Sequence, residues 1–103
     1  MNKLRRVQLG NLSAKLSLIE SIADKEVLDE CISILEDIKW DEEDYFDNMP
    51  ENLQGSMRGV ESEDAIDNMD QALDVLNEAI ESENDDELID AVGTAIAFID
   101  ECV

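Results

Sequence analysis

Apolar residues recur at helical spacing along most of the chain. From Leu12 to Ile38 they follow one another at steps of three and four, the period of an α-helix. We expect a long helix over residues 2–47, either continuous or broken near Asp24, which could serve as the N-cap of a second helix. The stripe consists of Leu12, Leu16, Ile19, Ala23, Val27, Cys31, Leu35 and Ile38.

The segment NMPENLQGSMRG, residues 48–59, interrupts this pattern. It contains the only proline, Pro50, which disfavours helical conformation in the residue before it. Its glycines, Gly55 and Gly59, permit a positive φ. We therefore expect a reversing loop over residues 48–61, longer than the roughly two to eight residues that usually join helices. The candidate contact residues of this loop are Asn52, Gln54 and Arg58.

A further helix is expected over residues 62–82, with Ser62 as its N-cap and acidic residues in its first turn. Its apolar residues step by three and four in alternation, as in the seam of a coiled coil. Alanines beside this seam allow another helix to approach closely. The seam consists of Ile66, Met69, Leu73, Leu76 and Ile80.

The last expected helix covers residues 85–102. Asn84 with Glu87 three positions later fits a capping box. Its apolar face consists of Leu88, Val92, Ala95, Ile99 and Cys102. Gly93 within it indicates either close packing or a tolerated defect. Together these patterns predict one all-α domain, an antiparallel helical hairpin or bundle of three to four helices with coiled-coil-like packing.

Charge is distributed unevenly along the 103 residues, whose formal net charge is −21. Five basic residues against two acids give residues 1–25 a net charge of +3, whereas two basic residues against 26 acids give residues 26–103 a net charge of −24. Such an acidic body repels nucleic acids and membranes and attracts basic protein surfaces. The basic N-terminal arm could bind a second copy, so we expect a homodimer, or it could equally lie along its own acidic helices.

The composition also bears on the cellular location of the protein and on the catalytic or metal sites that it could form. There is no apolar run long enough to span a membrane and no signal-peptide pattern, which favours a cytoplasmic protein. Cys31 and Cys102 are expected to be free thiols. The chain has no histidine, the commonest general base and metal ligand. Without a nucleophile–base constellation or an EF-hand pattern, we expect neither an enzyme, nor a metal site, nor a cofactor.

Carboxylates at helical spacing are the most distinctive feature. Neighbours three and four positions apart lie on one side of a helix, and like charges there destabilise it slightly. No Lys or Arg follows Arg58 to balance them. The conservative interpretation is a solvated helix face; the functional one is a surface of phosphate-like carboxylates that occupies a basic nucleic-acid-binding groove. The candidate partner-binding residues are Asp67, Asp70, Asp74, Glu78 and Glu81, followed by Asp41, Glu42, Glu43 and Asp44.

Aromatic residues cluster just before the loop, as Trp40, Tyr45 and Phe46. Packing in the core or against the loop is the simpler interpretation. An exposed aromatic side chain beside acids would instead be typical of a binding hot spot for a partner.

The loop and the hairpin after it resemble a group of small acidic helical proteins of bacteriophages and prophages. The resemblance rests on three segments. Met1 to Arg6 match in kind the pattern Met-Asn-Lys-x-Arg-Arg, and DNMPENLQGSMRG matches Asn-Leu-Pro-Glu-Asn-Leu-Gln-x-Ser-x-Arg-Gly. AIDNMDQALDVLNEAIES matches the acidic hairpin that follows. Met49 and Met57 depart from the Leu and Glu usual there. The resemblance implies a phage or prophage origin and the cytoplasm of a bacterial host, and no catalytic residues.

Taken together, these features predict a non-catalytic interaction protein. We expect it to inhibit a host or defence protein that handles nucleic acid, by presenting carboxylates in place of phosphates to its basic surface. It would bind neither nucleic acid nor a membrane directly. The alternative is a scaffold or assembly protein that binds a partner through the apolar seam and the loop.

Overall fold

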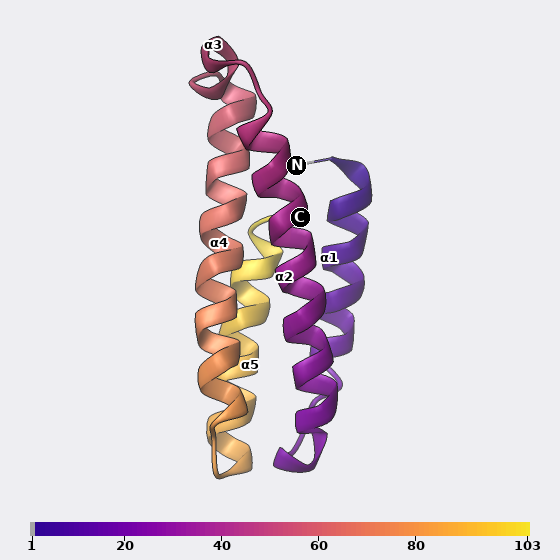
Figure 1. Cartoon of the computed structure of the whole chain (residues 1–103). Helices are drawn as coiled ribbons and strands as arrows, with labels where there is room; N and C mark the ends of the chain where they lie inside the picture. The colour runs from indigo at the N-terminus through magenta and orange to yellow at the C-terminus, as the bar shows by residue number, and fades with distance from the viewer. Residues whose placement is uncertain (1) are drawn as a thin grey trace.

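The structure is a computed structural model that describes residues 2–103. Four long helices, α1 (Lys3–Leu16), α2 (Lys25–Asp47), α4 (Met57–Ile80) and α5 (Asp85–Asp100), run alternately up and down (Figure 1). Two short helical turns, η1 (Ile22–Asp24) and α3 (Glu51–Gln54), lie in the connections. The described part of the chain contains no strand, so the prediction of an all-α antiparallel bundle is confirmed.

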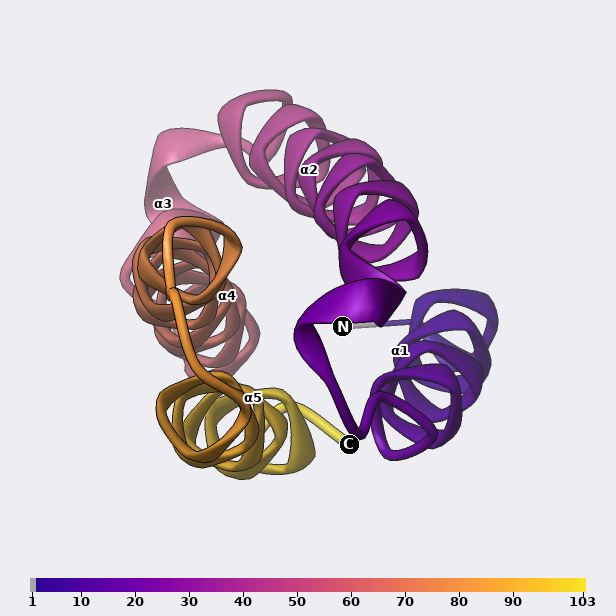
Figure 2. The ribbon, with the colours of Figure 1, turned by 90° about the horizontal axis from the view of Figure 1, so that it is seen from below.

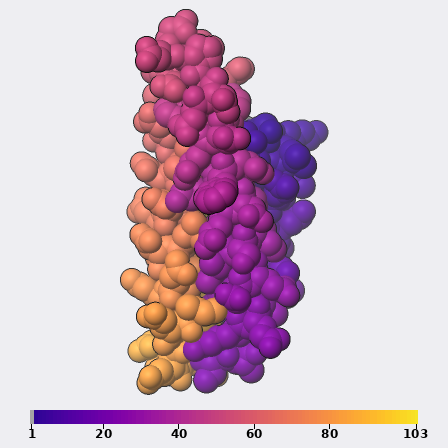
Figure 3. Space-filling view, in the orientation of Figure 1, coloured from indigo at the N-terminus to yellow at the C-terminus, as the bar shows by residue number. Residues whose placement is uncertain are grey.

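The four long helices form a closed ring. Each packs against two neighbours, in the order α1, α2, α4, α5 and back to α1, and the view along the bundle shows α1 and α4 at opposite corners (Figure 2). The body measures 48 × 20 × 18 Å. Because α2 and α4 are longer than α1 and α5, their ends project together with α3 as a two-helix tip (Figure 3).

The core is aliphatic. The middle of the predicted α4 seam is fully packed inside the chain, and its outer members Ile66 and Ile80 are half-buried. The core is completed by the predicted face of α5 and by the inward stripe of α1 and α2. Its largest fully buried apolar side chains are Leu9, Leu16, Leu28, Leu35, Met69, Leu76, Leu88 and Ile99.

Residues 2–47 form two antiparallel helices with a true break between them, not one rod. The break is stabilised by a capping box in which the Ser21 hydroxyl accepts from the Ala23 amide, and the Asp24 carboxylate accepts from the Ser21 amide. Asp24 therefore serves the η1 turn, and as the residue preceding α2 it makes no side-chain cap. Ile19 continues the apolar stripe into the connection, where it is buried beneath the bundle end.

The predicted loop over residues 48–61 is shorter than expected, because α4 begins at Met57 and not after Ser62. Ser56 is the actual N-cap, and its hydroxyl accepts from the Gly59 amide at 3.5 Å. Ser62 lies in the second turn of α4 and is completely buried. At the other end of the hairpin, Asn84 caps α5 as predicted, accepting from the Glu87 amide at 2.8 Å.

Candidate functional site

The acidic stripe predicted on the third helix lies on the exposed side of α4. All five of its carboxylates are exposed, while the apolar residues between them face the core. Only Asp70 has a cationic partner within the described residues, at 2.5 Å from Lys39 of α2. This hydrogen bond raises the pKa of Lys39 and keeps it charged. The remaining members of the stripe, Asp67, Asp74, Glu78 and Glu81, are open to a partner.

The exposed acidic surface extends well beyond the stripe. Every acid that follows Arg58 is exposed, over α4, α5 and their connection. No Lys or Arg in the sequence lies among them, and apart from Lys39 beside Asp70 and Arg6 beside Glu61, Asp64 and Glu101, these acids form one anionic face. These acids are Glu61, Glu63, Asp64, Asp67, Asp70, Asp74, Glu78, Glu81, Glu83, Asp85, Asp86, Glu87, Asp90, Asp100 and Glu101.

The second predicted set of acids, near the end of α2, divides between the surface and the core. Asp41 and Asp44 are exposed, and Glu43 is half-buried at 3.4 Å from Lys39. Glu42 has no exposed surface, so its assignment as a partner-binding residue is wrong. Its position follows Leu35 and Ile38 by steps of three and four, which places it on the inward face of α2.

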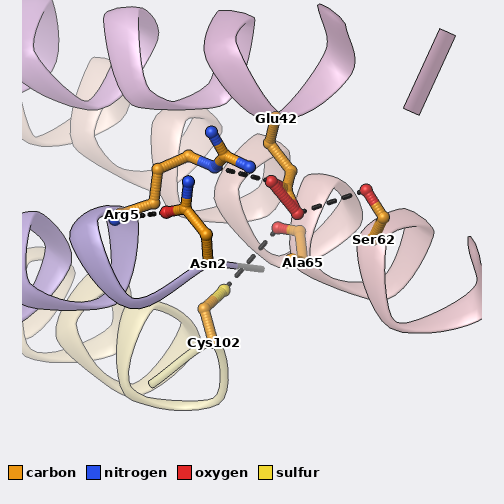
Figure 4. A network of polar contacts seen from close by, with 6 residues as sticks. All are labelled: Asn2, Arg5, Glu42, Ser62, Ala65 and Cys102. Carbon is orange, nitrogen blue, oxygen red and sulfur yellow. Dashed lines mark hydrogen bonds and ion pairs between the residues drawn. The ribbon is translucent and has the colours of Figure 1, made fainter. Parts of the chain in front are cut away.

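Glu42 instead anchors a buried polar network that joins three helices (Figure 4). Its Oε2 accepts from Arg5 Nε of α1 at 2.7 Å, and its Oε1 accepts from the Ser62 hydroxyl of α4 at 3.2 Å. The Arg5 guanidinium also lies over the ring of Tyr45, 5.3 Å from its centroid. These contacts keep the carboxylate inside the bundle and explain the burial of Ser62.

Cys102 lies close to this network. Its thiol lies 3.6 Å from the carbonyl oxygen of Ala65 (Figure 4), and burial raises its pKa to about 11. Cys31 is fully buried in the core, where burial likewise raises its pKa. Both cysteines are free thiols, and the raised pKa values favour the protonated, unreactive form.

Gln54, one of the predicted contact residues of the loop, forms its side-chain hydrogen bonds within its own chain. Its side-chain amide donates to the carbonyl oxygens of Phe46 and Met49, both at 3.2 Å, and so satisfies the end of α2. The other two predicted loop residues, Asn52 and Arg58, are exposed. The loop is therefore partly a cap over the hairpin end and partly an open surface.

Gly59 is required by a close approach between backbones. A Cβ built there would lie 1.9 Å from the carbonyl oxygen of Gln54, so no larger residue fits without moving the corner. No glycine among residues 2–103 has a positive φ, so the predicted reason for Gly55 and Gly59 is wrong. Gly93 is exposed with no heavy atom of the described chain within 4 Å of its built Cβ, which contradicts close packing there.

Trp40 does not pack in the core. It is 72% exposed on the outer face of α2, whereas Phe46 is half-buried and Tyr45 contacts Arg5. Three further apolar residues, Leu53, Met57 and Val60, are exposed at the tip formed by α3 and the start of α4. The tip is thus an exposed apolar surface, distinct from the acidic face of α4 and α5.

Hollows in the surface are open, and two of them combine basic and acidic residues in their lining. One, where the two chain ends meet, is lined by Arg6 together with Glu61, Asp64 and Glu101. Within residues 2–103, no three acidic or cysteine side chains converge so that they could hold a metal ion. No helix of that range is both long and apolar enough to cross a membrane.

Comparisons with protein-family models, with curated proteins and with solved structures find no match for the chain. The surfaces of the chain therefore carry the evidence for its function. Three surfaces are open to a partner: the anionic face of α4 and α5, the apolar tip around α3, and the outward side of α1, where Leu4 and Val7 are exposed.

Proposed function

We propose that the protein is a non-catalytic inhibitor that occupies the nucleic-acid-binding groove of a basic partner protein. The observation that carries the proposal is the anionic face of α4 and α5, whose acids are all exposed and have no Lys or Arg among them in the sequence. The resemblance to bacteriophage and prophage proteins suggests that the partner is a host or defence protein, met in the cytoplasm of a bacterium.

The charge density of this face supports the proposal. The 24 residues of α4 are about 36 Å long at a rise of about 1.5 Å per residue. The fifteen acids after Arg58 therefore amount to about one charge per 2.4 Å of axis, against about one per 1.7 Å in duplex DNA. A groove that binds phosphates chiefly by charge would meet a similar field on this face.

The cost of the face to the fold is a second argument. Like charges three or four positions apart destabilise a helix by a few tenths of a kcal/mol each. Mixed charges would solubilise the bundle equally well, as α1 and α2 illustrate with the pair of Lys15 and Glu30 at 3.0 Å. A one-sign surface that reduces stability is expected where it serves binding.

The test is an affinity capture from bacterial lysate with a matched pair of variants. In the stripe variant, Asp67→Asn, Asp74→Asn, Glu78→Gln and Glu81→Gln remove four charges from α4. The control variant, Glu26→Gln, Asp29→Asn, Glu36→Gln and Asp37→Asn, removes four exposed charges from α2. We expect the wild type and the control to retain a nucleic-acid-binding protein at low salt that high salt or free DNA releases, and the stripe variant to lose it.

A different result would reject the mimicry. If both variants lose the partner equally, net charge and not its placement decides binding. If the stripe variant binds normally, the face is only solvated.

The second candidate function is a scaffold that binds a partner through apolar contacts. The predicted seam of α4 is packed within the chain and is not available, so this function would depend on the tip, where Leu53, Met57 and Val60 are exposed. A partner held by the tip would remain bound at high salt, would be indifferent to DNA, and would be lost on Met57→Asp.

A further inference from the structure

The outward side of α1 is a largely apolar face that no described residue of the chain covers. Leu4 and Val7 of α1 are 64% and 52% exposed, with Asn11 and Ala14 following at helical steps, and Leu18, 75% exposed, lies in the turn just after α1 ends at Leu16. The opposite side of the same helix buries Leu9, Leu12 and Leu16 in the core. A helix that is apolar on both sides is typical of one that is buried on both sides.

The charge of α1 also differs from that of the other long helices. This helix contains Lys3, Arg5, Arg6 and Lys15 and no acidic residue, in a chain of net charge −21. Two copies that meet through the same helix, whether α2, α4 or α5, would bring acids against acids. Two α1 helices bring no acids together, and two of the four cations of α1, Arg5 and Lys15, are already paired with acids of their own chain, which limits like-charge repulsion at this face.

The spacing along this face is self-complementary. If two α1 helices cross antiparallel at Asn11, Leu4 of one copy lies opposite Leu18 of the other, and Val7 lies beside Ala14, one position from the residue directly opposite. The Asn11 side chains then meet at the two-fold axis, where a pair of amides can hydrogen-bond to each other and fix the register. Lys3 falls beside Glu20 of the other copy, which is exposed just after the helix.

Gly10 fits this arrangement and has no other structural reason in the bundle. It lies in the interior of α1, where glycine costs about 1 kcal/mol relative to alanine. A Cβ built there would meet no heavy atom of the described chain within 4 Å, so packing within the chain does not require glycine. Beside the crossing point, a missing side chain lets two helices approach closely.

We propose that the protein forms an antiparallel two-fold dimer through the outer face of α1, with the axis at Asn11. This differs from a basic arm lying on the acidic body of the partner copy. Three of the arm's cations already have partners in their own chain: Arg5 binds Glu42, Lys15 binds Glu30, and Lys25 donates to the Ser82 carbonyl oxygen at 2.6 Å.

The dimer leaves the anionic face free. Helix α4 stands at the corner of the bundle opposite α1 (Figure 2), so the two acidic stripes of a dimer face away from each other. They are separated by roughly two bundle widths, several times the Debye length of about 8 Å at physiological salt, and so repel little. The dimer does not depend on the proposed inhibition, and its tests need no target protein.

Sedimentation of the purified protein at about 100 µM is the first test. We expect wild type to sediment with twice the chain mass of 11.6 kDa. Val7→Asp with Leu18→Asp should raise the dimer dissociation constant about tenfold or more, because it places charges on the apolar contact. The matched control, Met57→Asp with Ile89→Asp, changes two apolar residues that are equally open elsewhere and should remain dimeric.

Cross-linking tests the register. In a Cys102→Ser background, Asn11→Cys should form a disulfide between two copies, since residue 11 meets itself at the axis. Leu4→Cys should not, because antiparallel helices place the two copies of residue 4 about 20 Å apart. Equal cross-linking by both variants would overturn the antiparallel arrangement. A wild type that stays monomeric would overturn the dimer, and its co-sedimentation with anionic phospholipid vesicles would assign the face to a membrane.

Discussion

Arg5 in α1 donates from Nε to Oε2 of Glu42 in α2 at 2.7 Å, and the two side chains are 11% and 0% exposed. This contact joins helices that are antiparallel neighbours, and through Ser62 it reaches α4. Because an ionised carboxylate without adequate hydrogen bonds is costly inside a protein, the network determines how these helices can be aligned.

Removing the donor should destabilise the bundle. We expect Arg5→Met to lower the free energy of unfolding by about 1.5–3 kcal/mol, the range for a hydrogen bond to a charged group. Helicity by circular dichroism during urea denaturation would measure the loss. The exposed Arg6→Met is the matched control and should change stability little.

A double-mutant cycle separates the pair from its surroundings. Arg5→Met together with Glu42→Met replaces both charges by apolar side chains, and should be less destabilising than the sum of the two single changes. Additive losses would mean that the two side chains act independently and that the contact contributes nothing of its own.

The corner between α3 and α4 should tolerate no side chain at position 59. Gly59→Ala places a methyl group against the backbone of Gln54, so we expect destabilisation of roughly 1–3 kcal/mol, as for overpacking. Gly93→Ala, in the exposed interior of α5, should stabilise by about 1 kcal/mol through helix propensity alone. Thermal unfolding of both variants and of wild type would measure the two changes in stability. A stabilising Gly59→Ala would contradict the close approach between the backbones.

The helices and their inward faces were predictable because the apolar period is strong. The seam of α4, the face of α5 and the cap at Asn84 are where the pattern placed them. The break between α1 and α2 was harder to locate, since Ile19 keeps the helical period while lying in the connection. The decisive signal was local: the Ser21 and Asp24 capping box, which contains no Gly or Pro.

The start of α4 and the role of Glu42 were missed for different reasons. Glycine is disfavoured within helices, so Gly59 suggested a loop, and only its contact with Gln54 explains why it lies inside α4. Glu42 lies among acidic neighbours in the sequence, yet it continues the inward positions of Leu35 and Ile38. Its partner Arg5 is 37 positions away in the sequence, and the local pattern of apolar and polar residues does not predict a contact over that distance.

The thiol of Cys102 should react slowly. Burial raises its pKa from an ordinary value of 9.0 to about 11, which reduces the thiolate fraction at pH 8 by about a hundredfold. Alkylation of the native protein at pH 8 should therefore be slow, and should reach the rate of a free cysteine in urea. Fast reaction of the native Cys102→Ser variant would show that Cys31, not Cys102, had been opened to reagent.

Stability should decrease as the pH rises from about 9 to 11. Between these values the unfolded chain releases the Cys102 proton while the folded chain retains it, so unfolding is favoured as the pH increases. Lys39, whose pKa is raised from 10.5 by its hydrogen bond to Asp70, acts in the same direction above that value. Urea midpoints measured across this window should shift less in Cys102→Ser, and an unchanged shift would contradict the contribution of the thiol.

Salt should stabilise the protein, because its acids repel one another on the folded surface more than in the extended chain. We expect the melting temperature to rise with added NaCl as the repulsion is screened. The variant Asp67→Asn, Asp74→Asn, Glu78→Gln and Glu81→Gln should be more stable than wild type by about 1 kcal/mol, or about 4–8 °C, and should respond less to salt. Differential scanning calorimetry at several salt concentrations would measure both effects. A stripe variant that melts below wild type would mean that these carboxylates support the fold, and the argument that they are retained for binding would lose its energetic basis.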